Sequence, residues 1–229
     1  SAKGQDAFYK NSGANYNQYD LRMNLDTKIN RYIDAYINVA ARMEDRKYPT
    51  RSAENIFRML MRSKPNSPAY WPNGLPGPDI EFGDNPVVIC TNQTGYDRDK
   101  QYVLNGDFGV NIKIPHVEGL SIKATASLDK GFRFRKIWQK PWYLYSWDGT
   151  SVDSNGQPVL VEGKKGFSDP RLTESMEDNL GILLSGIASY SRTFMDDHSV
   201  NVLAGVERIT DEGDSFEAFR RYFLSSSID

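Results

Sequence analysis

The chain has 229 residues, with 28 Lys and Arg against 30 Asp and Glu and a net charge of -2 at pH 7. This balance gives no general attraction to nucleic acid, so no nucleic-acid partner is expected. One cysteine excludes an internal disulfide, and two histidines beside it are too few for a typical zinc site. The sequence has no run of about 18 apolar residues and no signal-peptide pattern at its start.

Residues 19–43, "YDLRMNLDTKINRYIDAYINVAARM", alternate apolar and polar side chains except at Asn30 and Arg31. A period of two predicts two strands, and the two interrupting residues predict the turn of a hairpin. The stretch 19–29 would be about 36 Å long at about 3.3 Å per residue, enough for a tilted strand to cross a bilayer. The strand length leaves open whether its apolar side faces a protein core or lipid.

The same alternation returns at 101–114, 120–135, 179–194 and 198–210, which brings the expected long strands to six. The turns 115–119 and 195–197 are short, whereas the connections 44–98 and 136–175 far exceed the usual hairpin loop of about 2 to 5 residues. Short turns at one edge and long loops at the other are typical of outer-membrane barrels. The expected fold is therefore all-β, an antiparallel up-and-down meander of about six long strands that forms a partial transmembrane β-barrel.

The first long loop carries the signals of one short helix. Ser52 is a plausible N-cap, Glu54 lies in the first turn, and Pro65 disfavours helical geometry at Lys64. We expect the helix to carry one apolar stripe of Ile56, Phe57, Leu60 and Met61.

A glycoside hydrolase is the natural rival interpretation, because it needs two carboxylates across a cleft. The pairs available by position are Asp79 with Glu81, Asp196 with Asp197, and Glu174 with Glu177. Nothing in the sequence brings these pairs to one site, and we expect them to be solvated loop carboxylates. We therefore predict no enzyme, no catalytic residues and no cofactor.

Other chemical signals in the chain are weak. His116 and His198 fall in or beside two different turns, and no G-x-S-x-G motif occurs. The stretches 97–100, "DRDK", and 148–156, "DGTSVDSNG", offer oxygen ligands, but the second lacks the spacing of a calcium loop. No metal site is predicted. The run "FRFRKIWQK" at 132–140 suggests a membrane interface, where aromatic girdles sit and cations meet lipid head groups, rather than nucleic-acid binding.

Aromatic side chains in the two long loops are the candidate contacts to a ligand, because flat rings stack on the apolar faces of sugars. The alternative is that they pack the loops together or dock a lipoprotein partner. They are Tyr70, Trp71, Trp138, Trp142, Tyr143, Tyr145 and Trp147.

Four stretches together resemble the SusC/RagA type of TonB-dependent outer-membrane transporter, found in Bacteroidetes. They are "YNQYDLRMNLDTKINRYIDAYINVAARMED", "IFRMLMRSKPNSPAYWPNGLPGPDIEFGDNPV", "KIPHVEGLSIKATASL" and "ASYSRTFMDDHSVNVLAGVER". The resemblance implies a 22-stranded barrel with a plug, energised by TonB and covered by a SusD-like surface lipoprotein that captures glycan or peptide.

By the same resemblance, residues 1–229 form part of the barrel in the outer membrane of a Gram-negative bacterium, with 44–98 and 136–175 as extracellular loops. The plug domain, the segment that contacts TonB and the closing C-terminal strand are expected to be absent. The implied function is import of nutrients, with oligosaccharide the first candidate. Two alternatives stay open: a soluble β-sandwich that binds or cleaves carbohydrate, and a barrel segment with a purely structural role.

Overall fold

The computed structural model describes residues 1–7, 9, 12–195 and 198–223. Seven antiparallel strands form one open sheet in the order β1-β2-β3-β4-β5-β8-β9, and β6 and β7 form a separate two-stranded ribbon. The strands are β1 (Ala2–Asp6), β2 (Asn15–Lys28), β3 (Ile33–Tyr48), β4 (Gly95–Lys113), β5 (Leu120–Gln139), β6 (Trp142–Ser146), β7 (Val161–Lys165), β8 (Arg171–Phe194) and β9 (His198–Arg221). The helices are α1 (Ala53–Arg62), α2 (Pro86–Ile89) and the 3-10 turn η1 (Asn92–Thr94). The predicted antiparallel meander of six long strands is confirmed. None of the described helices is long and apolar enough to cross a membrane.

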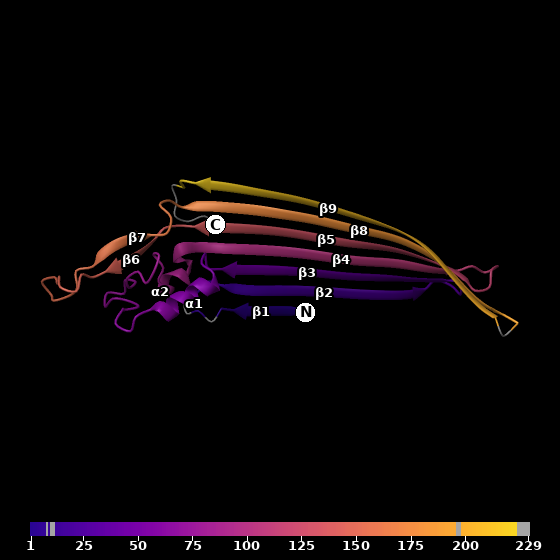
Figure 1. Cartoon of the computed structure of the whole chain (residues 1–229), viewed down its shortest axis with the longest axis horizontal. Coiled ribbons are helices and arrows are strands. Elements are labelled where there is room, and N and C mark those ends of the chain that lie inside the picture. Colours follow the sequence, from indigo (N-terminus) through magenta and orange to yellow (C-terminus); the bar gives the residue numbers. More distant parts are fainter. Residues whose placement is uncertain (8, 10–11, 196–197, 224–229) are drawn as a thin grey trace.

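Short and long connections lie at opposite ends of the sheet, as the sequence predicts. The turns 29–32 and 114–119 lie at one end, together with the β8–β9 connection, of which residues 196–197 lie outside the described part. The helices and the β6–β7 ribbon lie at the other end (Figure 1). The long connections are 49–94 and 140–170, shorter than the expected 44–98 and 136–175. The strands extend further towards the loop end than predicted, because residues beyond the apolar stretches still pair in the β-ladder, as Tyr48 does with Asp97.

One face of the sheet carries a continuous stripe of apolar side chains, which we call the apolar band. It occupies 19–29, 33–43, 102–112, 120–128 and 180–190, that is, nine to eleven residues a strand, and shortens to 200–206 on the edge strand β9. The register aligns its loop-side edge across three strands, at Tyr19, Met43 and Tyr102, and on β5 the ring of Phe132 continues this row beyond the end of the band. Leu21, Met23 and Leu25 expose 67, 54 and 52 % of their surface. No second sheet in the described part of the chain covers the band, which is the arrangement opposite to that of a β-sandwich.

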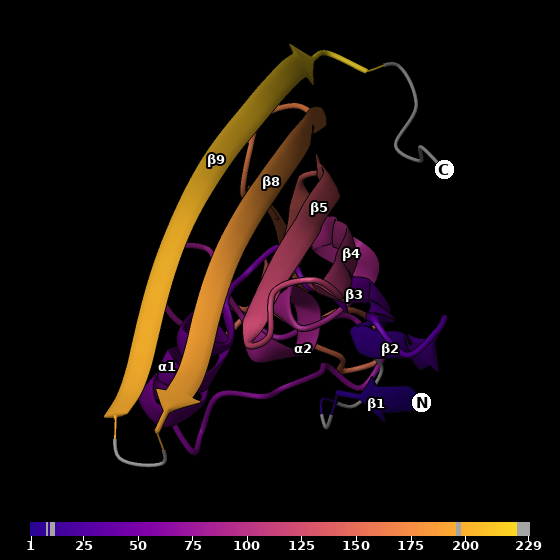
Figure 2. The same cartoon turned by 90° about the vertical axis from the view of Figure 1, so that its right-hand side faces the viewer.

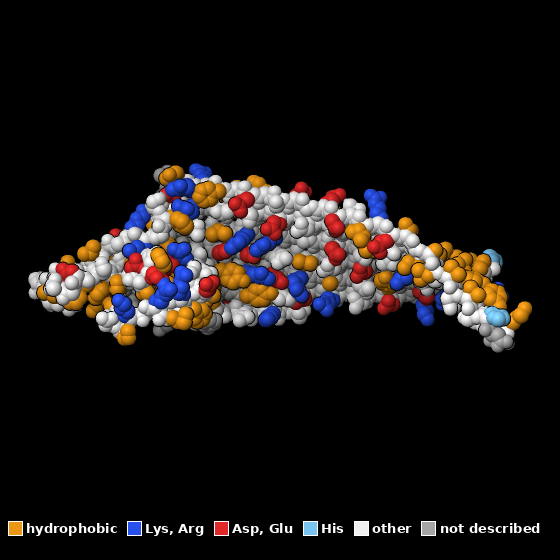
Figure 3. Space-filling view, viewed as in Figure 1, with side chains coloured by type: hydrophobic (Ala, Val, Ile, Leu, Met, Phe, Trp, Pro, Cys, Tyr) orange, Lys and Arg blue, Asp and Glu red, His pale blue; other side chains and the backbone are white. Residues whose placement is uncertain are grey.

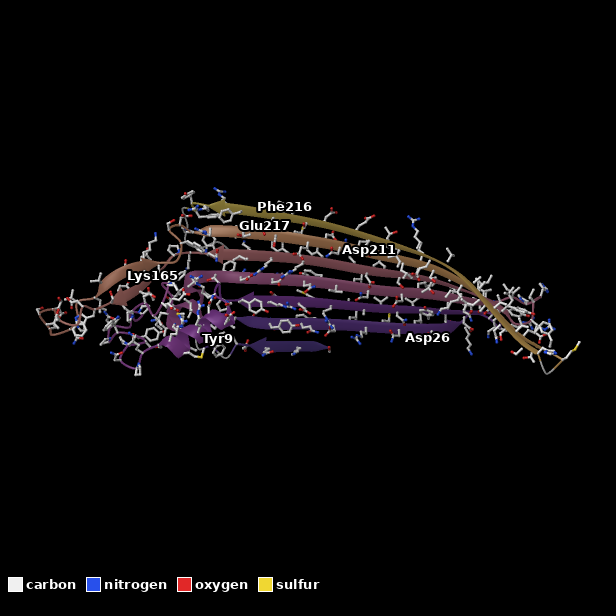
Figure 4. The ribbon with its side chains drawn as sticks, viewed as in Figure 1. Tyr9, Asp26, Lys165, Asp211, Phe216 and Glu217 are labelled. Carbon is white, nitrogen blue, oxygen red and sulfur yellow. The ribbon has the colours of Figure 1, made fainter. Side chains whose placement is uncertain are left out.

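The opposite face, which we call the polar face, carries the other parity of each strand. On it Arg42 of β3 donates a hydrogen bond to Asp20 of β2 at 2.8 Å, as expected for side chains that share one face. Charged side chains of both signs spread over this face (Figure 3). Asp26 of β2 and Asp211 of β9 lie on it away from the helices (Figure 4). The alternation of the sequence therefore separates an apolar side from a charged side over the band on β2, β3 and β4, and less strictly on β8, where Leu183 and Ile187 belong to the polar face.

Buried apolar side chains gather outside the sheet, in the unit formed by 49–94 and 140–170, which we call the loop cap. Its core consists of Ile56, Met59, Val88, Ile89, Cys90, Trp142 and Leu144. The helices of the cap lie to one side of the sheet at its loop end (Figure 2). They cover part of the polar face, because α1 residues line the same hollow as Asp97 and Arg135. Burial raises the pKa of the Cys90 thiol, which suits an unreactive core residue.

Helix α1 begins where the sequence predicts. The Ser52 hydroxyl accepts a hydrogen bond from the Asn55 N–H at 3.3 Å, which is the geometry of an N-cap. The expected stripe is wrong in three of its four members, since only Ile56 of that set is buried. The second buried position is Met59, one helical turn from Ile56, because this short helix meets the core along a narrow line. The exposed members are Phe57, Leu60 and Met61.

Candidate ligand-facing surface

A belt of paired charges crosses the polar face just below the loop cap. Arg133 donates two hydrogen bonds to the Asp99 carboxylate, both at 2.9 Å, and Arg135 donates two to Asp97, at 3.0 and 2.6 Å. Asp99 keeps only 5 % of its surface exposed. Two-pronged pairs of this kind fix both partners in place. The loop end of the polar face therefore carries a rigid row of charges whose net charge is close to zero.

This geometry corrects the interpretation of "FRFRKIWQK". Phe132 and Phe134 do stand on the side of the apolar band. There the Phe132 ring packs against the Tyr102 ring, with 6.2 Å between the two ring centroids. Arg133 and Arg135 point to the opposite face, because neighbouring residues of a strand alternate. They meet carboxylates there and not lipid, and they also occupy the oxygen atoms that "DRDK" offered to a calcium ion.

Two contacts close the loop cap on itself next to the ends of β3 and β4. The hydroxyls of Thr50 and Thr94 lie 2.6 Å apart, across the base of the first long connection. Arg51 donates from Nε to Asp84 at 3.2 Å and lies 5.2 Å above the Trp142 ring. Burial raises the pKa of the Asp84 carboxyl despite this arginine. The cap is thus a packed unit rather than a set of free loops.

Two of the seven candidate aromatic residues are buried, Trp142 in the core of the cap and Trp138 near the end of β5. Trp142 is 4 % exposed and donates its indole N–H to the Gly83 carbonyl at 2.9 Å. Trp138 is 2 % exposed and meets the Phe223 ring edge-on at 5.0 Å. Their burial leaves no ring face open to a ligand, so both support the surface and do not form it.

Trp71 and Trp147 line one hollow of about 360 Å³ at the tip of the cap, together with Arg62, Lys64 and Asp79. The Trp71 indole N–H donates to the Tyr145 carbonyl at 2.9 Å, and that of Trp147 to the Ser151 carbonyl at 2.6 Å. Each ring is therefore held by its edge. This arrangement brings residues of both long connections, far apart in the sequence, to one concave site.

The three remaining aromatic candidates lie near this hollow in the chain but do not line it. Tyr70 and Tyr143 expose 47 and 42 % of their surface. Tyr145 donates its hydroxyl to Glu162 at 2.6 Å, which raises the pKa of the phenol. A second and larger hollow, of about 560 Å³, lies between the first residues of the chain, the ends of β2 and β3, and α1; its rim includes Tyr9, Tyr16 and Tyr48. Sequence reasoning missed it because its residues come from four separate parts of the chain, 5–16, 47–56, Asp97 and Arg135. Tyr9 sits beside the helices (Figure 4).

The described carboxylates considered for catalysis are held in ion pairs with separate cations. Glu81 pairs with Arg62 in the cap, and Asp79 lies 3.1 Å from the Lys165 ammonium, which Figure 4 labels at the base of β7. Glu174 meets Lys136 and Glu177 meets Arg133, both at 3.6 Å. His116 and His198 lie at the turn end, and Asp196 and Asp197 fall outside the described residues. Among described residues no three potential metal ligands cluster.

Solved structures share this fold. The chain aligns with the structure of the RagAB peptide transporter at a TM-score of 0.62 and 19 % identity, over 93 % of this chain and 22 % of that chain. The RagAB peptide importer in its "closed-closed" and "open-open" states aligns at TM-scores of 0.58 and 0.59, with 17 % identity and the same coverage. This chain therefore spans about a fifth, 22 %, of the length of the chains it matches. No protein-family model and no curated protein matches the sequence. The resemblance to RagA-type transporters is thereby confirmed for the fold.

Proposed function

We propose that this chain forms part of the wall and the surface loops of a TonB-dependent outer-membrane transporter of the SusC/RagA type, which imports nutrients. The observation that carries the proposal is the apolar band: an exposed apolar stripe of nine to eleven residues on five neighbouring strands. A transmembrane strand needs about 9 to 11 residues. In a soluble protein such a stripe would need a second layer over it.

The position of the loops then sets the orientation. Outer-membrane barrels have short periplasmic turns and longer extracellular loops. In this proposal the turn end of the sheet faces the periplasm, and the loop cap, 49–94 and 140–170, stands outside the cell. The polar face, with its ion pairs, lines the interior of the barrel. The edge strands β1 and β9 continue into further strands of the same barrel, because an open sheet edge cannot stay unpaired in lipid.

The substrate and partners rest on the resemblance and on the cap. Oligosaccharide and peptide are the two candidates, and the similarity to RagAB, a peptide transporter, favours peptide. We place the contacts to substrate or to a SusD-like lipoprotein on the five accessible rings, with Trp138 and Trp142 as their support. The five are Tyr70, Trp71, Tyr143, Tyr145 and Trp147. The TonB complex would act through a plug region that this chain does not resemble, and the wall itself performs no chemistry.

The test uses the full-length protein that carries this chain. Recovery from the outer membrane in detergent, with gel mobility that changes on heating, is the expected result. Recovery of the protein from the soluble fraction would contradict it. Uptake of labelled oligosaccharides and labelled peptides then separates the two substrates. Trp71→Ala with Trp147→Ala should lower uptake, whereas the matched pair Phe57→Ala with Met61→Ala, also exposed in the cap but outside the hollow, should not.

A further inference from the structure

The hollow at the tip of the loop cap has an apolar part built around Trp71 and Trp147. Both indole N–H groups already donate to backbone carbonyls of the cap, so the two rings offer a ligand apolar surface and no hydrogen bond. The other apolar residues of the lining are Pro68, Pro78 and Ile80. The volume of about 360 Å³ falls within the range of small-molecule sites, about 300–1,000 Å³.

A tight turn, 64–67, supplies polar groups to the same hollow. The Ser67 N–H donates to the Lys64 carbonyl at 3.0 Å, and Pro65 fixes the second position of the turn. The side chains of Lys64, Asn66 and Ser67 line the hollow, and their ammonium, amide and hydroxyl groups can all donate hydrogen bonds. Within the described part of the chain none of these three side chains has a hydrogen bond or an ion pair. One rigid turn thus presents three free donors.

The other charges of the hollow are neutralised by partners in the cap. Arg62 donates to both carboxylate oxygens of Glu81. Asp79 lies 3.1 Å from the Lys165 ammonium through one oxygen and accepts a backbone N–H at 2.9 Å through the other. Three cations, Arg62, Lys64 and Lys165, therefore stand against two carboxylates, which leaves a net charge of +1. That charge belongs to Lys64, beside the apolar part of the hollow.

We propose that this hollow binds a carboxylate group of the imported substrate and holds an apolar part of the same substrate against Trp71 and Trp147. The inference rests on the proposed function, because it takes the cap as a surface that meets substrate. The Lys64 ammonium forms the ion pair, and Asn66 and Ser67 add neutral hydrogen bonds to the carboxylate. Such a group belongs to an acidic side chain or the C-terminus of a peptide, or to a uronic acid of an oligosaccharide. An uncharged substrate leaves Lys64 without a partner and binds more weakly.

The experiment compares acidic and neutral ligands on the full-length protein in detergent, by fluorescence anisotropy. The peptide pair is a labelled, amidated pentapeptide of leucine and glycine with one glutamate, and its twin with glutamine in that place. The sugar pair is labelled trigalacturonic acid and its methyl ester. The wild type should bind the acidic member of at least one pair about fivefold more tightly, a factor that a partly exposed ion pair supplies. The pair that shows the preference identifies the source of the carboxylate.

Two substitutions at one position test the role of the ammonium group. Lys64→Gln should abolish the preference, and Lys64→Glu should reverse it in favour of the neutral member of the pair. The matched control is Lys140→Gln, which removes a lysine of the cap that does not line the hollow and should keep the wild-type preference. No preference in the wild type, an unchanged preference in Lys64→Gln, or an equal loss in Lys140→Gln would overturn the inference.

The same variants separate this inference from the proposed function. Trp71→Ala with Trp147→Ala should weaken binding of the acidic ligand, and undiminished binding would overturn the site. If that pair lowers uptake of acidic and neutral substrates alike while Lys64→Gln changes neither, the proposed function stands and the carboxylate site is refuted. A protein that forms no heat-modifiable barrel refutes both.

Discussion

A glycine on the polar face gives a prediction that depends on one close contact. Tyr36 of β3 is the register partner of Gly109 of β4, and its ring lies over the glycine. A Cβ atom added at Gly109 would overlap ring atoms Cε1 and Cζ and lie 2.7 Å from the hydroxyl oxygen. The Lys123 ammonium lies 5.8 Å from the centroid of the same ring. Gly109→Ala would therefore have to displace a ring that is held from both sides.

The size of the effect follows from two opposing contributions. Alanine in a strand is favoured over glycine by about 0.5–1 kcal/mol, whereas forcing an extra carbon into packed atoms costs about 1–3 kcal/mol. At Gly109 we expect a net loss of about 1–2 kcal/mol in the free energy of unfolding. Gly106 of the same strand is the matched control, because nothing lies within 4 Å of a Cβ added there. Gly106→Ala should leave stability unchanged or raise it by up to about 1 kcal/mol.

The assay is urea unfolding of the full-length barrel in detergent micelles, followed by the loss of heat-modifiable gel mobility. Tyr36→Ala completes a double-mutant cycle with Gly109→Ala. If the clash is the cause, the second substitution should cost about 1 kcal/mol less in the Tyr36→Ala background. Equal effects of Gly109→Ala and Gly106→Ala, or no coupling to Tyr36, would refute the contact.

Three further predictions follow from the two faces and the cap. Leu25→Arg places a cation in the middle of the apolar band and should cost about 2–4 kcal/mol of barrel stability in lipid, measured by the same unfolding assay. Arg133→Met leaves the buried Asp99 carboxylate without its two hydrogen bonds and should cost about 1–3 kcal/mol, which the double variant with Asp99→Leu should partly restore. Asp169 accepts two hydrogen bonds from Arg221, at 3.0 and 2.8 Å, which lower the pKa of its carboxyl below the usual 3.8. A carboxyl with a lowered pKa stabilises the folded state at every pH above its ordinary pKa, and this stabilisation is lost as the pH falls through the lowered pKa. The difference in stability between wild type and Asp169→Asn should therefore persist at pH 5 and vanish only well below pH 3.8.

The sheet could be predicted from the sequence wherever one side of a strand is apolar. The alternation in 19–29 and 33–43 predicts β2 and β3, because each residue type follows from which side it faces. Strands β4 and β5 extend beyond the band through polar pairs such as Arg135 with Asp97, and no alternation of hydrophobicity marks these extensions. The sequence does not predict the short strands β1, β6 and β7, because five residues each are too few to show a clear period; only β6 has an apolar side, formed by Trp142 and Leu144.

The loop cap was much less predictable. The composition of the long connections identifies them as irregular and rich in aromatic residues, but it does not tell a buried ring from an open one. Trp142 and Trp147 stand five residues apart; the first fills the core of the cap and the second lines its hollow. Trp142 bonds to Gly83, and Trp147 shares its hollow with Trp71; both of these residues come from the other long connection. Contacts between distant segments of this kind are not encoded in local spacing.

The central claim is that the apolar band faces lipid, and accessibility along one strand tests it most directly. Cys90 is the single cysteine of this chain, so replacing it and every other cysteine of the full-length protein by Ala gives a background for single cysteines at each position from 21 to 28 in β2. Spin labels at these sites in the full-length protein, inserted into lipid, report collisions with oxygen, which concentrates in lipid, and with a water-soluble nickel complex. We predict that the ratio of oxygen collisions to nickel collisions alternates with a period of two. Oxygen should dominate at Leu21, Met23 and Leu25, and the nickel complex at the positions between them. Equal access of the nickel complex to both parities, or oxygen dominance at the charged parity, would contradict the claim.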